Sequence, residues 1–420
     1  MRLEEIRFKN YKAFKSEQKL TIKPVTILIG KNSSGKSAVA RLPLLLGRSM
    51  SNSSNSPIEL QFDSLEFGGS FKDLVHNRID HGNISFTLIF EDEGNTSELG
   101  VTVQNIADSP LQFISSYYIK SDGFKLFLNI LIDDYVDSRT AIQSYEVKGN
   151  IEGKFSVRFK GLLIDELFDK KGHLFKPSFN LDIFNDKVKE VFSDLDYIGP
   201  FRTQPERDYI FKGSIPKTTG YGGELAPHIL GIDSYVNKDL IEIVGDWYKE
   251  NLGGWQLEIE NVGTKFQIVL VSPDNSNVKV NLRDVGHGMS QVLPLIVRSA
   301  IGTAGMEGLM IIEQPELHLH PAAHGGLAEL IVSSIMEEGS NWIIETHSEL
   351  FILRIRRLIA EGKIPPSDVI IYLIEDEERP GSTLKKITID EEGEVSDWPR
   401  GVFSEDYEEM VAIRKAQKNK

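Results

Sequence analysis

The chain has 420 residues, of which 40% are hydrophobic and 26% charged, a composition typical of a globular protein with a substantial core. Its net charge of −15 argues against a protein that coats nucleic acid over its whole surface, although a local basic patch is compatible with it. Because cysteine is absent, disulfide frameworks, cysteine-ligated zinc and thiol catalysis are excluded, and we expect a reducing compartment, the cytoplasm. No apolar run approaches the roughly 20 residues of a membrane span, so we expect no membrane partner.

The N-terminal residues 3–22 alternate as paired strands do, and they lead to the most informative stretch of the chain. Val25–Ile29 is an apolar, β-branched run that predicts a buried strand. It continues into G-x-x-x-x-G-K-S at 30–37, and helix-like sequence follows up to Leu46, with Pro43 expected to bend or end that helix. Strand, glycine loop and helix in this order are the context of a phosphate-binding loop.

Each residue type in this loop has a chemical task. Gly30 and Gly35 permit backbone angles that let successive N–H groups point at phosphate oxygens, and the following helix adds the positive end of its dipole. Lys36 is expected to reach the β- and γ-phosphates, and the Ser37 hydroxyl to ligate Mg²⁺. The predicted nucleotide-binding residues of the loop are Gly30, Lys31, Asn32, Ser33, Ser34, Gly35, Lys36, Ser37 and Ala38.

Two aromatic residues ahead of the loop have two interpretations. Tyr11 and Phe14 precede the predicted strand, where an aromatic ring can stack on adenine. Both are equally consistent with aromatic residues of the hydrophobic core. The sequence leaves the choice open.

The middle of the chain is predicted to contain a polar loop, many short strands and several helices. Residues 49–57 are a polar loop, and 58–160 carry many short β-type runs that predict a meander of strands. Arg202 and Arg207 follow a Gly-Pro turn, either as surface charges or as site cations. The other elements predicted here are a mixed segment ending in a helix (163–192), a strand at 197–198, helices over 224–252 and strands at 255–260, 266–271 and 278–282.

Three further motifs lie in the last third of the chain. An apolar strand at 308–312 ends in Glu313, the pattern of a Walker B strand whose carboxylate holds Mg²⁺ through water. Upstream, a glycine turn at 283–291 opens a predicted helix at 292–301 and is a second place where phosphate can bind. Downstream, a strand beginning at Trp342 ends in His347.

Together these motifs resemble the heads of ABC-type ATPases, and within them the RecF/SMC-like group that includes the OLD (overcoming lysogenization defect) ATPases. The strings that carry the resemblance are E-x-P-E-x-H-L-H-P at 313–321 and E-T-H-S at 345–348. The tail at 389–399 is similar to the ending of a subfamily of bacterial ATPases. The resemblance implies an α/β ABC-ATPase head with a P-loop core, an antiparallel β subdomain and a helical lobe.

It also implies a domain plan. The ATPase core is expected from 1–50 and 255–375, with the strand-rich meander and helical lobe inserted at 51–254. Residues 376–420 are expected to be a C-terminal extension and tail. The residues after His347 are too few for the metal-binding nuclease domain of OLD-type nucleases, so we expect a standalone ATPase subunit that acts through a separate effector.

The resemblance assigns roles to the remaining motif residues. Two ATP molecules would be sandwiched in a head-to-tail dimer, with the segment around 285–291 capping the γ-phosphate from the partner. His347 would be the switch histidine that contacts this phosphate, and 317–321 would be the dimer-contact loop. The cofactor-binding residues expected from this second segment are Val285, Gly286, His287, Gly288, Met289 and Ser290.

Two positions depart from the family's pattern. Gly286 stands where a serine is usual, which weakens one phosphate contact. Gln314 stands where most relatives have the glutamate that polarises the attacking water, and a glutamine orients water but cannot take its proton. We therefore treat Gln314, Glu316 and His347 as the candidates for the catalytic step, assign Ser37 and Glu313 to Mg²⁺, and expect slow turnover.

Two clusters of side chains have a functional and a structural interpretation. The histidines at 318, 320 and 324 lack a fourth ligand for a metal site, so we expect a structural role in the dimer-contact loop. The arginines at 354, 356 and 357 are expected to form a solvated helix face, with contact to DNA or a partner as the alternative.

The P-loop thus predicts an ATP-binding subunit, and the resemblance implies that it hydrolyses ATP slowly and forms a homodimer or higher oligomer. By resemblance alone, it would gate a separate nuclease or toxin in bacterial anti-phage defence. One alternative is a RecF-like DNA repair or maintenance ATPase that binds DNA directly. The other is a scaffold that stays bound to ATP without hydrolysing it.

Overall fold

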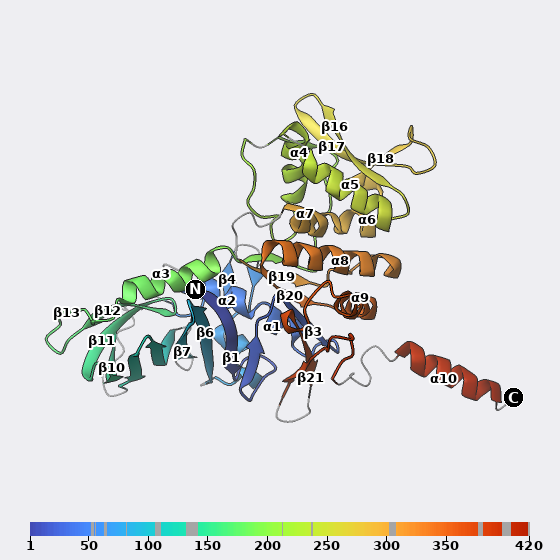
Figure 1. Cartoon of the computed structure of the whole chain (residues 1–420). Helices are drawn as coiled ribbons and strands as arrows, with labels where there is room; N and C mark the ends of the chain where they lie inside the picture. The colour runs from blue at the N-terminus through green and yellow to red at the C-terminus, as the bar shows by residue number, and fades with distance from the viewer. Residues whose placement is uncertain are drawn as a thin grey trace. The chain divides into compact units, whose positions relative to one another are not determined.

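The computed structural model describes residues 1–51, 54, 56–62, 65–80, 82–105, 111–131, 142–211, 213–236, 238–301, 308–376, 381–396 and 405–418. The chain forms two compact units, whose elements are labelled in Figure 1. The first unit contains 1–23, 32–195 and 374–384, and the second contains 24–31, 196–373 and 385–420. The predicted α/β class is confirmed, because both units combine helices with sheets. Residues 397–399 of the tail lie outside the described residues.

The first unit is built on a ten-stranded antiparallel sheet in the order β13-β12-β11-β10-β9-β8-β7-β6-β1-β2. The meander predicted from the sequence is present, and the N-terminal strands extend it: Phe8 of β1 pairs with Phe86 of β6. Along β6, buried side chains alternate with partly exposed ones, as in an antiparallel sheet that packs on the core with one face only. The strands are β1 Arg2–Lys9, β2 Gln18–Thr21, β6 Asn83–Asp92, β7 Asn95–Asn105, β8 Gln112–Ser121, β9 Phe124–Ile130, β10 Ile142–Gly149, β11 Gly153–Lys160, β12 Leu163–Phe168 and β13 Leu174–Phe175.

The helices of the first unit are α1 Lys36–Ala40, α2 Leu42–Ser51 and α3 Leu181–Ser193. Pro43 does not end a helix as expected: the break falls at Arg41, and Pro43 lies in the first turn of α2, where no helical N–H donor is needed. Gly47 lets α2 approach α3, since a Cβ there would lie 2.8 Å from Phe192. The short elements are β4 Gln61–Phe62, β5 Leu65–Glu66, η1 Phe71–Leu74 and η2 His76–Arg78.

A six-stranded sheet in the order β14-β19-β20-β3-β21-β22 carries the predicted site strands. β14, β19, β20 and β3 run parallel, and every residue of β3, β19 and β20 is buried. Their continuous apolar sequences are explained by this burial on both faces. The strands are β3 Val25–Gly30, β14 Asp196–Ile198, β19 Leu309–Glu313, β20 Asn341–Glu345, β21 Val369–Glu375 and β22 Thr383–Ile387.

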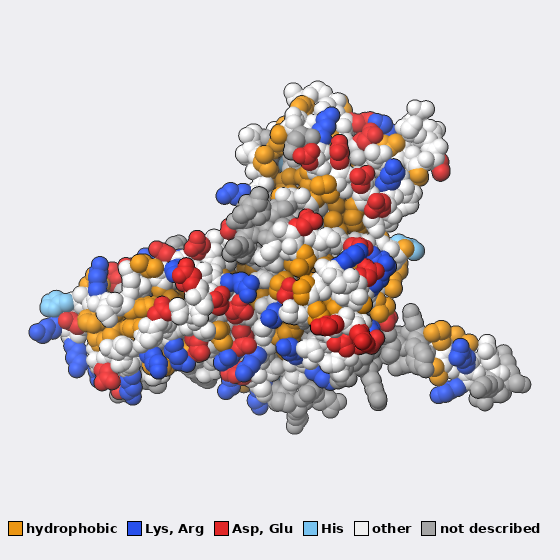
Figure 2. Space-filling view, in the orientation of Figure 1, with side chains coloured by type: hydrophobic (Ala, Val, Ile, Leu, Met, Phe, Trp, Pro, Cys, Tyr) orange, Lys and Arg blue, Asp and Glu red, His pale blue; other side chains and the backbone are white. Residues whose placement is uncertain are grey.

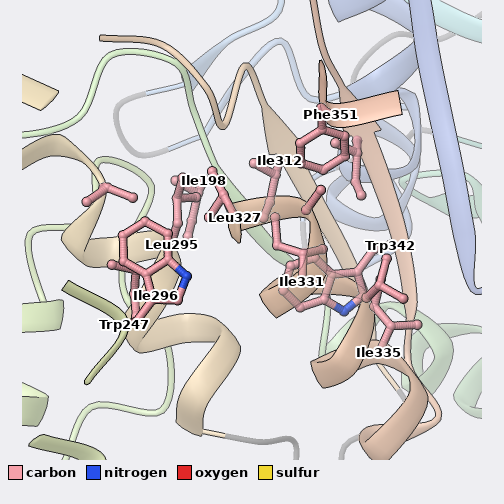
Figure 3. Packing of buried hydrophobic residues seen from close by; sticks show 14 of the residues in the cluster. Ile198, Trp247, Leu295, Ile296, Ile312, Leu327, Ile331, Ile335, Trp342 and Phe351 are labelled. Carbon is pink, nitrogen blue, oxygen red and sulfur yellow. The ribbon is translucent and has the colours of Figure 1, made fainter. Parts of the chain in front are cut away.

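The second unit also contains a helical lobe with a small antiparallel sheet (Figure 1). Buried residues of this lobe, among them Trp247, share one hydrophobic core with Leu327, Trp342 and Phe351 near the six-stranded sheet (Figure 3). The remaining elements are α4 Ala226–Val236, α5 Asp239–Asn251, α6 His287–Gln291, α7 Leu293–Ile301, α8 Pro321–Glu338, α9 Glu349–Ala360, α10 Glu405–Lys418, β15 Tyr209–Ile210, β16 Gln256–Val262, β17 Lys265–Val271, β18 Lys279–Asn281, η3 Leu282–Asp284 and η4 Pro366–Asp368.

The surface carries both signs of charge. On the face shown in Figure 2, lysine and arginine side chains are interspersed with aspartate and glutamate. In the described part of the chain, no helix is both long enough and apolar enough to cross a bilayer.

Candidate nucleotide-binding site

The glycine loop after β3 has the backbone that its sequence requires. Gly30, Ser33 and Gly35 all have positive φ angles, of 146°, 64° and 106°. Gly35 is also needed for space, since a Cβ there would lie 3.0 Å from the Phe14 ring. α1 begins immediately after, at Lys36. Alternating backbone handedness of this kind turns successive N–H groups toward one point, so the donor set of the loop fits a phosphate.

The two side chains expected to act in this loop differ in exposure. Lys36 is only 4% exposed, whereas Ser37 is half-buried. An ammonium group inside a protein is stabilised by negative charge or by oriented dipoles. Lys31, Asn32 and Ser33 are exposed at the tip of the loop. The loop therefore presents backbone donors at its tip and a lysine at its base.

The ends of three parallel strands lie at one edge of the six-stranded sheet. Glu313 of β19 is in register with Glu345 of β20, and Glu345 is in register with Leu28 of β3. Ligands of parallel α/β sheets bind at this carboxyl edge. Glu313 is 1% exposed, and its Oε1 accepts a hydrogen bond of 3.0 Å from the Tyr197 hydroxyl. Its carboxylate is an oxygen donor of the type that Mg²⁺ takes.

Arg202 contacts the turn that follows Glu313. Its Nη2 donates to the carbonyl oxygens of Gln314 at 2.9 Å and Glu313 at 3.2 Å. Arg202 is 6% exposed, and this burial lowers the pKa of its guanidinium to about 10. It is therefore not the surface charge that one interpretation of the sequence proposed. Gln314 itself has a φ of 46°, and its N–H donates to the carbonyl oxygen of Glu345 at 2.7 Å.

Glu316 connects this turn to the one that contains His347. Its Oε1 accepts a hydrogen bond of 2.6 Å from the backbone N–H of His347. Burial raises the pKa of the Glu316 carboxyl, while hydrogen bonds from His347 and Thr346 oppose the rise. The His347 side chain is exposed. The structure thus brings Gln314, Glu316 and His347 together with Glu313 at the strand tips.

The segment Val285–Ser290 begins as a turn and continues as α6. Gly286 caps this helix and is exposed, as is His287. Gly288 packs so closely on the loop at 317–321 that a Cβ would overlap the carbonyl oxygen of His318. The last two residues of the segment are fixed by contacts within the chain. The carbonyl oxygen of Met289 accepts a 2.5 Å hydrogen bond from the Tyr248 hydroxyl, and Ser290 is buried.

The histidines at 320 and 324 have local partners. His320 caps α8, accepting a hydrogen bond of 3.3 Å from the N–H of Ala322. His324 Nδ1 shares a 2.7 Å hydrogen bond with the Ser348 hydroxyl. Among the described residues, no group of three metal-ligating side chains is assembled. These contacts indicate structural roles for His320 and His324.

The three arginines of α9 are all paired inside the chain. Arg354 contacts Glu329 at 2.5 Å, Arg356 donates to the Gly393 carbonyl oxygen at 2.6 Å, and Arg357 contacts Glu361 at 2.6 Å. This pairing favours the solvated helix face over a nucleic-acid contact.

The two aromatic candidates for adenine stacking are buried. Tyr11 is 1% exposed and Phe14 is 0% exposed, and both pack edge-on against Phe8. Their burial favours the interpretation as core residues.

Two residues around the site, Tyr197 and Thr346, were not assigned to it by sequence reasoning, which had left Arg202 open between a surface charge and a site cation. Tyr197 and Arg202 reach the turn because β14 pairs with β19, placing Ile198 beside Ile312. The available signal was the Gly-Pro turn that directs the chain out of β14 toward Arg202.

Comparison with known families gives two matches. A family described as "AAA domain, putative AbiEii toxin, Type IV TA system" matches residues 25–354. A second, described as "Protein of unknown function (DUF3696)", matches residues 364–412. No curated protein matches the chain.

Among solved structures, the chain is similar to the SMC head domain from Thermotoga maritima, with 12% identity, a TM-score of 0.45, and coverage of 93% of this chain and 100% of that one. It is also similar to an Smc head bound to the C-winged helix domain of ScpA, with 13% identity, a TM-score of 0.46, and coverage of 93% and 98%. A third is the Smc head domain with an extended coiled coil bound to the C-terminal domain of ScpA derived from Pyrococcus furiosus, with 11% identity, a TM-score of 0.46, and coverage of 98% and 99%. Likeness at this distance carries no argument about function.

Proposed function

Because the chain belongs to the family described as "AAA domain, putative AbiEii toxin, Type IV TA system", we propose that it binds ATP with Mg²⁺ and hydrolyses it slowly. The observation that carries the proposal is the glycine loop after β3, with positive φ at Gly30 and Gly35 and a buried Lys36. Glu313 at the tip of β19, in the sheet that contains β3, supports it.

In this proposal, different residues would hold the phosphates, the metal ion and the attacking water. The loop N–H groups and Lys36 would hold the phosphates, while Ser37 and Glu313 would hold Mg²⁺. When bound, the metal neutralises charge on the phosphate oxygens. Gln314 would orient the attacking water, but its amide cannot accept the proton. Slow turnover follows from this substitution.

We extend the proposal to assembly, by resemblance to the RecF/SMC-like and OLD-like ATPases. Two heads would close head-to-tail on ATP, with 285–290 of each contributing to the site of its partner. The domain plan of a core at 1–50 and 255–375, with an insertion at 51–254, is part of this proposal. The closed dimer would act in the cytoplasm as a switch on a separate effector. The family's description names a toxin–antitoxin system, which supports a role in defence.

A scaffold that binds ATP without hydrolysing it is the second candidate. It is favoured by Gln314 and by Glu316, whose Oε1 already accepts the His347 N–H and whose side chain is 9% exposed. Direct DNA binding, as in a RecF-like ATPase, gains less support because the arginines of α9 are paired within the chain.

The proposal is tested by titrating ATP and Mg²⁺ into the wild type and into Lys36→Ala, with calorimetric detection. Binding should be lost in Lys36→Ala, because the main cation on the β- and γ-phosphates is removed. Lys363→Ala is the control, since Lys363 is an exposed lysine paired with Glu329 and Glu361. Wild-type affinity in a folded Lys36→Ala protein would refute the assignment of the loop.

Steady-state phosphate release separates the hydrolysing switch from the scaffold. Gln314→Glu supplies a proton acceptor in the slot for the attacking water, and general-base help is typically worth about 10²- to 10⁴-fold. We expect release from this variant to exceed that of the wild type. Release from neither protein, with ATP bound to both, would select the scaffold.

A further inference from the structure

We propose that Arg202 and Glu316 are positioning residues, which lock the Walker B turn (313–316) to the histidine turn (345–348) so that Gln314 and His347 keep one fixed arrangement. We call this set of contacts the tip joint. Its kinetic consequences rest on the proposed ATP hydrolysis, whereas its structural consequences do not.

The two turns exchange hydrogen bonds beyond the end of the sheet. The parallel ladder of β19 and β20 reaches Glu313 and Glu345. Past that point, Gln314 donates its N–H to the Glu345 carbonyl oxygen at 2.7 Å. In the opposite direction, His347 donates its N–H to Glu316 Oε1 at 2.6 Å. Each turn thus donates one N–H to the other, which restricts movement of either turn alone.

Arg202 fixes the backbone of Gln314. With a φ of 46°, Gln314 adopts a conformation that residues other than glycine rarely hold. Such a conformation persists when its surroundings over-determine it. Here the N–H of Gln314 is held by Glu345 and its carbonyl oxygen by Arg202 at 2.9 Å. The direction of the Gln314 side chain therefore depends on Arg202.

Glu316 also interacts with Arg202. Both are buried, at 9% and 6% exposed, and the carboxylate attracts the guanidinium. The guanidinium has acceptors of its own, the carbonyl oxygens of Glu313 and Gln314, so its place in the tip joint does not depend on this attraction alone. Glu316 Oε2 is buried and makes no hydrogen bond within the described part of the chain. Replacing this oxygen by the NH₂ of a glutamine would therefore leave the bond between Oε1 and His347 intact.

This geometry separates a positioning role from a role as general base. If Glu316 positions His347, Glu316→Gln should retain kcat, and Glu316→Ala should lower kcat by about 10²-fold with little change in the affinity for ATP. If Glu316 were the base, both variants would lose about 10²- to 10⁴-fold in kcat. Rescue by the conservative variant is thus the discriminating result.

The experiment compares Glu316→Gln, Glu316→Ala, Arg202→Lys and Arg202→Met in the full chain. Glu361→Gln and Arg357→Met are matched controls, since this pair is exposed and lies at the end of α9. The first readout is amide hydrogen exchange in a peptide spanning 341–351, without nucleotide. Loss of one hydrogen bond should raise exchange at His347 by roughly tenfold in Glu316→Ala but not in Glu316→Gln. The second readout is kcat together with the affinity for ATP.

If Glu316→Ala does not fold, the Arg202 variants test the tip joint independently. A lysine at 202 can still donate to the two carbonyl oxygens, so Arg202→Lys should keep protection and kcat, and Arg202→Met should lose both. Unchanged exchange in Glu316→Ala and Arg202→Met would overturn the tip joint. So would equal losses of kcat in Glu316→Gln and Glu316→Ala. A wild type that neither binds nor hydrolyses ATP would refute the proposed function. The hydrogen-exchange data would still show whether the tip joint restricts the two turns.

Discussion

Charged side chains behave differently in the two large sheets. In the ten-stranded sheet they form exposed pairs on neighbouring strands, such as Lys120 with Glu98, whose side chains are 41% and 26% exposed. Around the six-stranded sheet, Glu313, Glu316 and Arg202 are buried near the strand tips. Water solvates the first kind of charge, whereas the second kind must find its partners inside the protein. Charge is therefore buried at the tips of the parallel strands, whereas in the ten-stranded sheet it lies in exposed cross-strand pairs.

The largest effect expected from this difference concerns the ion pair of Asp196 and Arg298. The two side chains are 3.0 Å apart, and each is 8% exposed. Arg298→Ala would leave the Asp196 carboxylate buried without this partner, which should cost about 3–5 kcal/mol of the free energy of unfolding. Urea titration followed by circular dichroism measures this loss. A loss below about 1 kcal/mol, as for an exposed pair, would show that the buried and the exposed ion pairs do not differ in their contribution to stability.

A second prediction concerns the contact of Gly288 with His318. Gly288→Ala forces backbone to move, because its Cβ would overlap the His318 carbonyl oxygen, and such overpacking typically costs about 1–3 kcal/mol. Gly286→Ala is the matched control for stability, since a Cβ there meets nothing within 4 Å. Thermal unfolding of the two variants should therefore differ. Equal melting temperatures would contradict the close packing of Gly288 on His318.

The pH dependence of stability provides a smaller effect. Burial raises the pKa of Glu316 above its ordinary value of 4.5, so the folded state holds this proton more strongly than the unfolded state does. Its contribution is full below pH 4.5 and is lost as pH rises through the folded pKa. Glu316→Gln does not titrate, so stability relative to the wild type should increase from pH 4.5 toward neutrality. A constant difference across this range would contradict the burial of an ionisable Glu316.

The smallest effect is expected in the ten-stranded sheet. Lys120 and Glu98 lie 2.7 Å apart but are both partly solvated. A double-mutant cycle with Lys120→Ala and Glu98→Ala should give a coupling energy of about 0.2–1 kcal/mol, decreasing at high salt. A coupling comparable to that of Asp196 and Arg298 would show that exposure does not separate the two classes of charge.

The parts of the site predicted from sequence are those that local patterns encode. The strand, the glycines and Lys36 are contiguous, and an apolar strand ending in Glu313 needs no distant partner to be recognised. Arg202 is different, because its acceptors are the carbonyl oxygens of residues 111 and 112 positions away. Glu316 reaches His347 across 31 positions. No local pattern encodes such pairings, so their roles emerged only from the structure.

In the fold, too, the features encoded by local sequence patterns were predictable, and those that depend on distant pairings were not. The meander at 58–160 was predictable from alternating residues and turns, but its extension by β1 depends on pairing between Phe8 and Phe86. The helix break also differed, since the sequence singled out Pro43 whereas the backbone turns at Arg41. A proline in the first turn of a helix is compatible with it, and only the position of that turn distinguishes the two cases.

The most direct test of the proposed switch is the oligomeric state of the wild type, measured by sedimentation velocity with and without ATP and Mg²⁺. The account predicts a species of twice the mass only with nucleotide. Since Gln314 makes turnover slow, this species should persist, whereas in Gln314→Glu it should decay as phosphate is released. A wild type saturated with ATP that stays strictly monomeric would contradict the account.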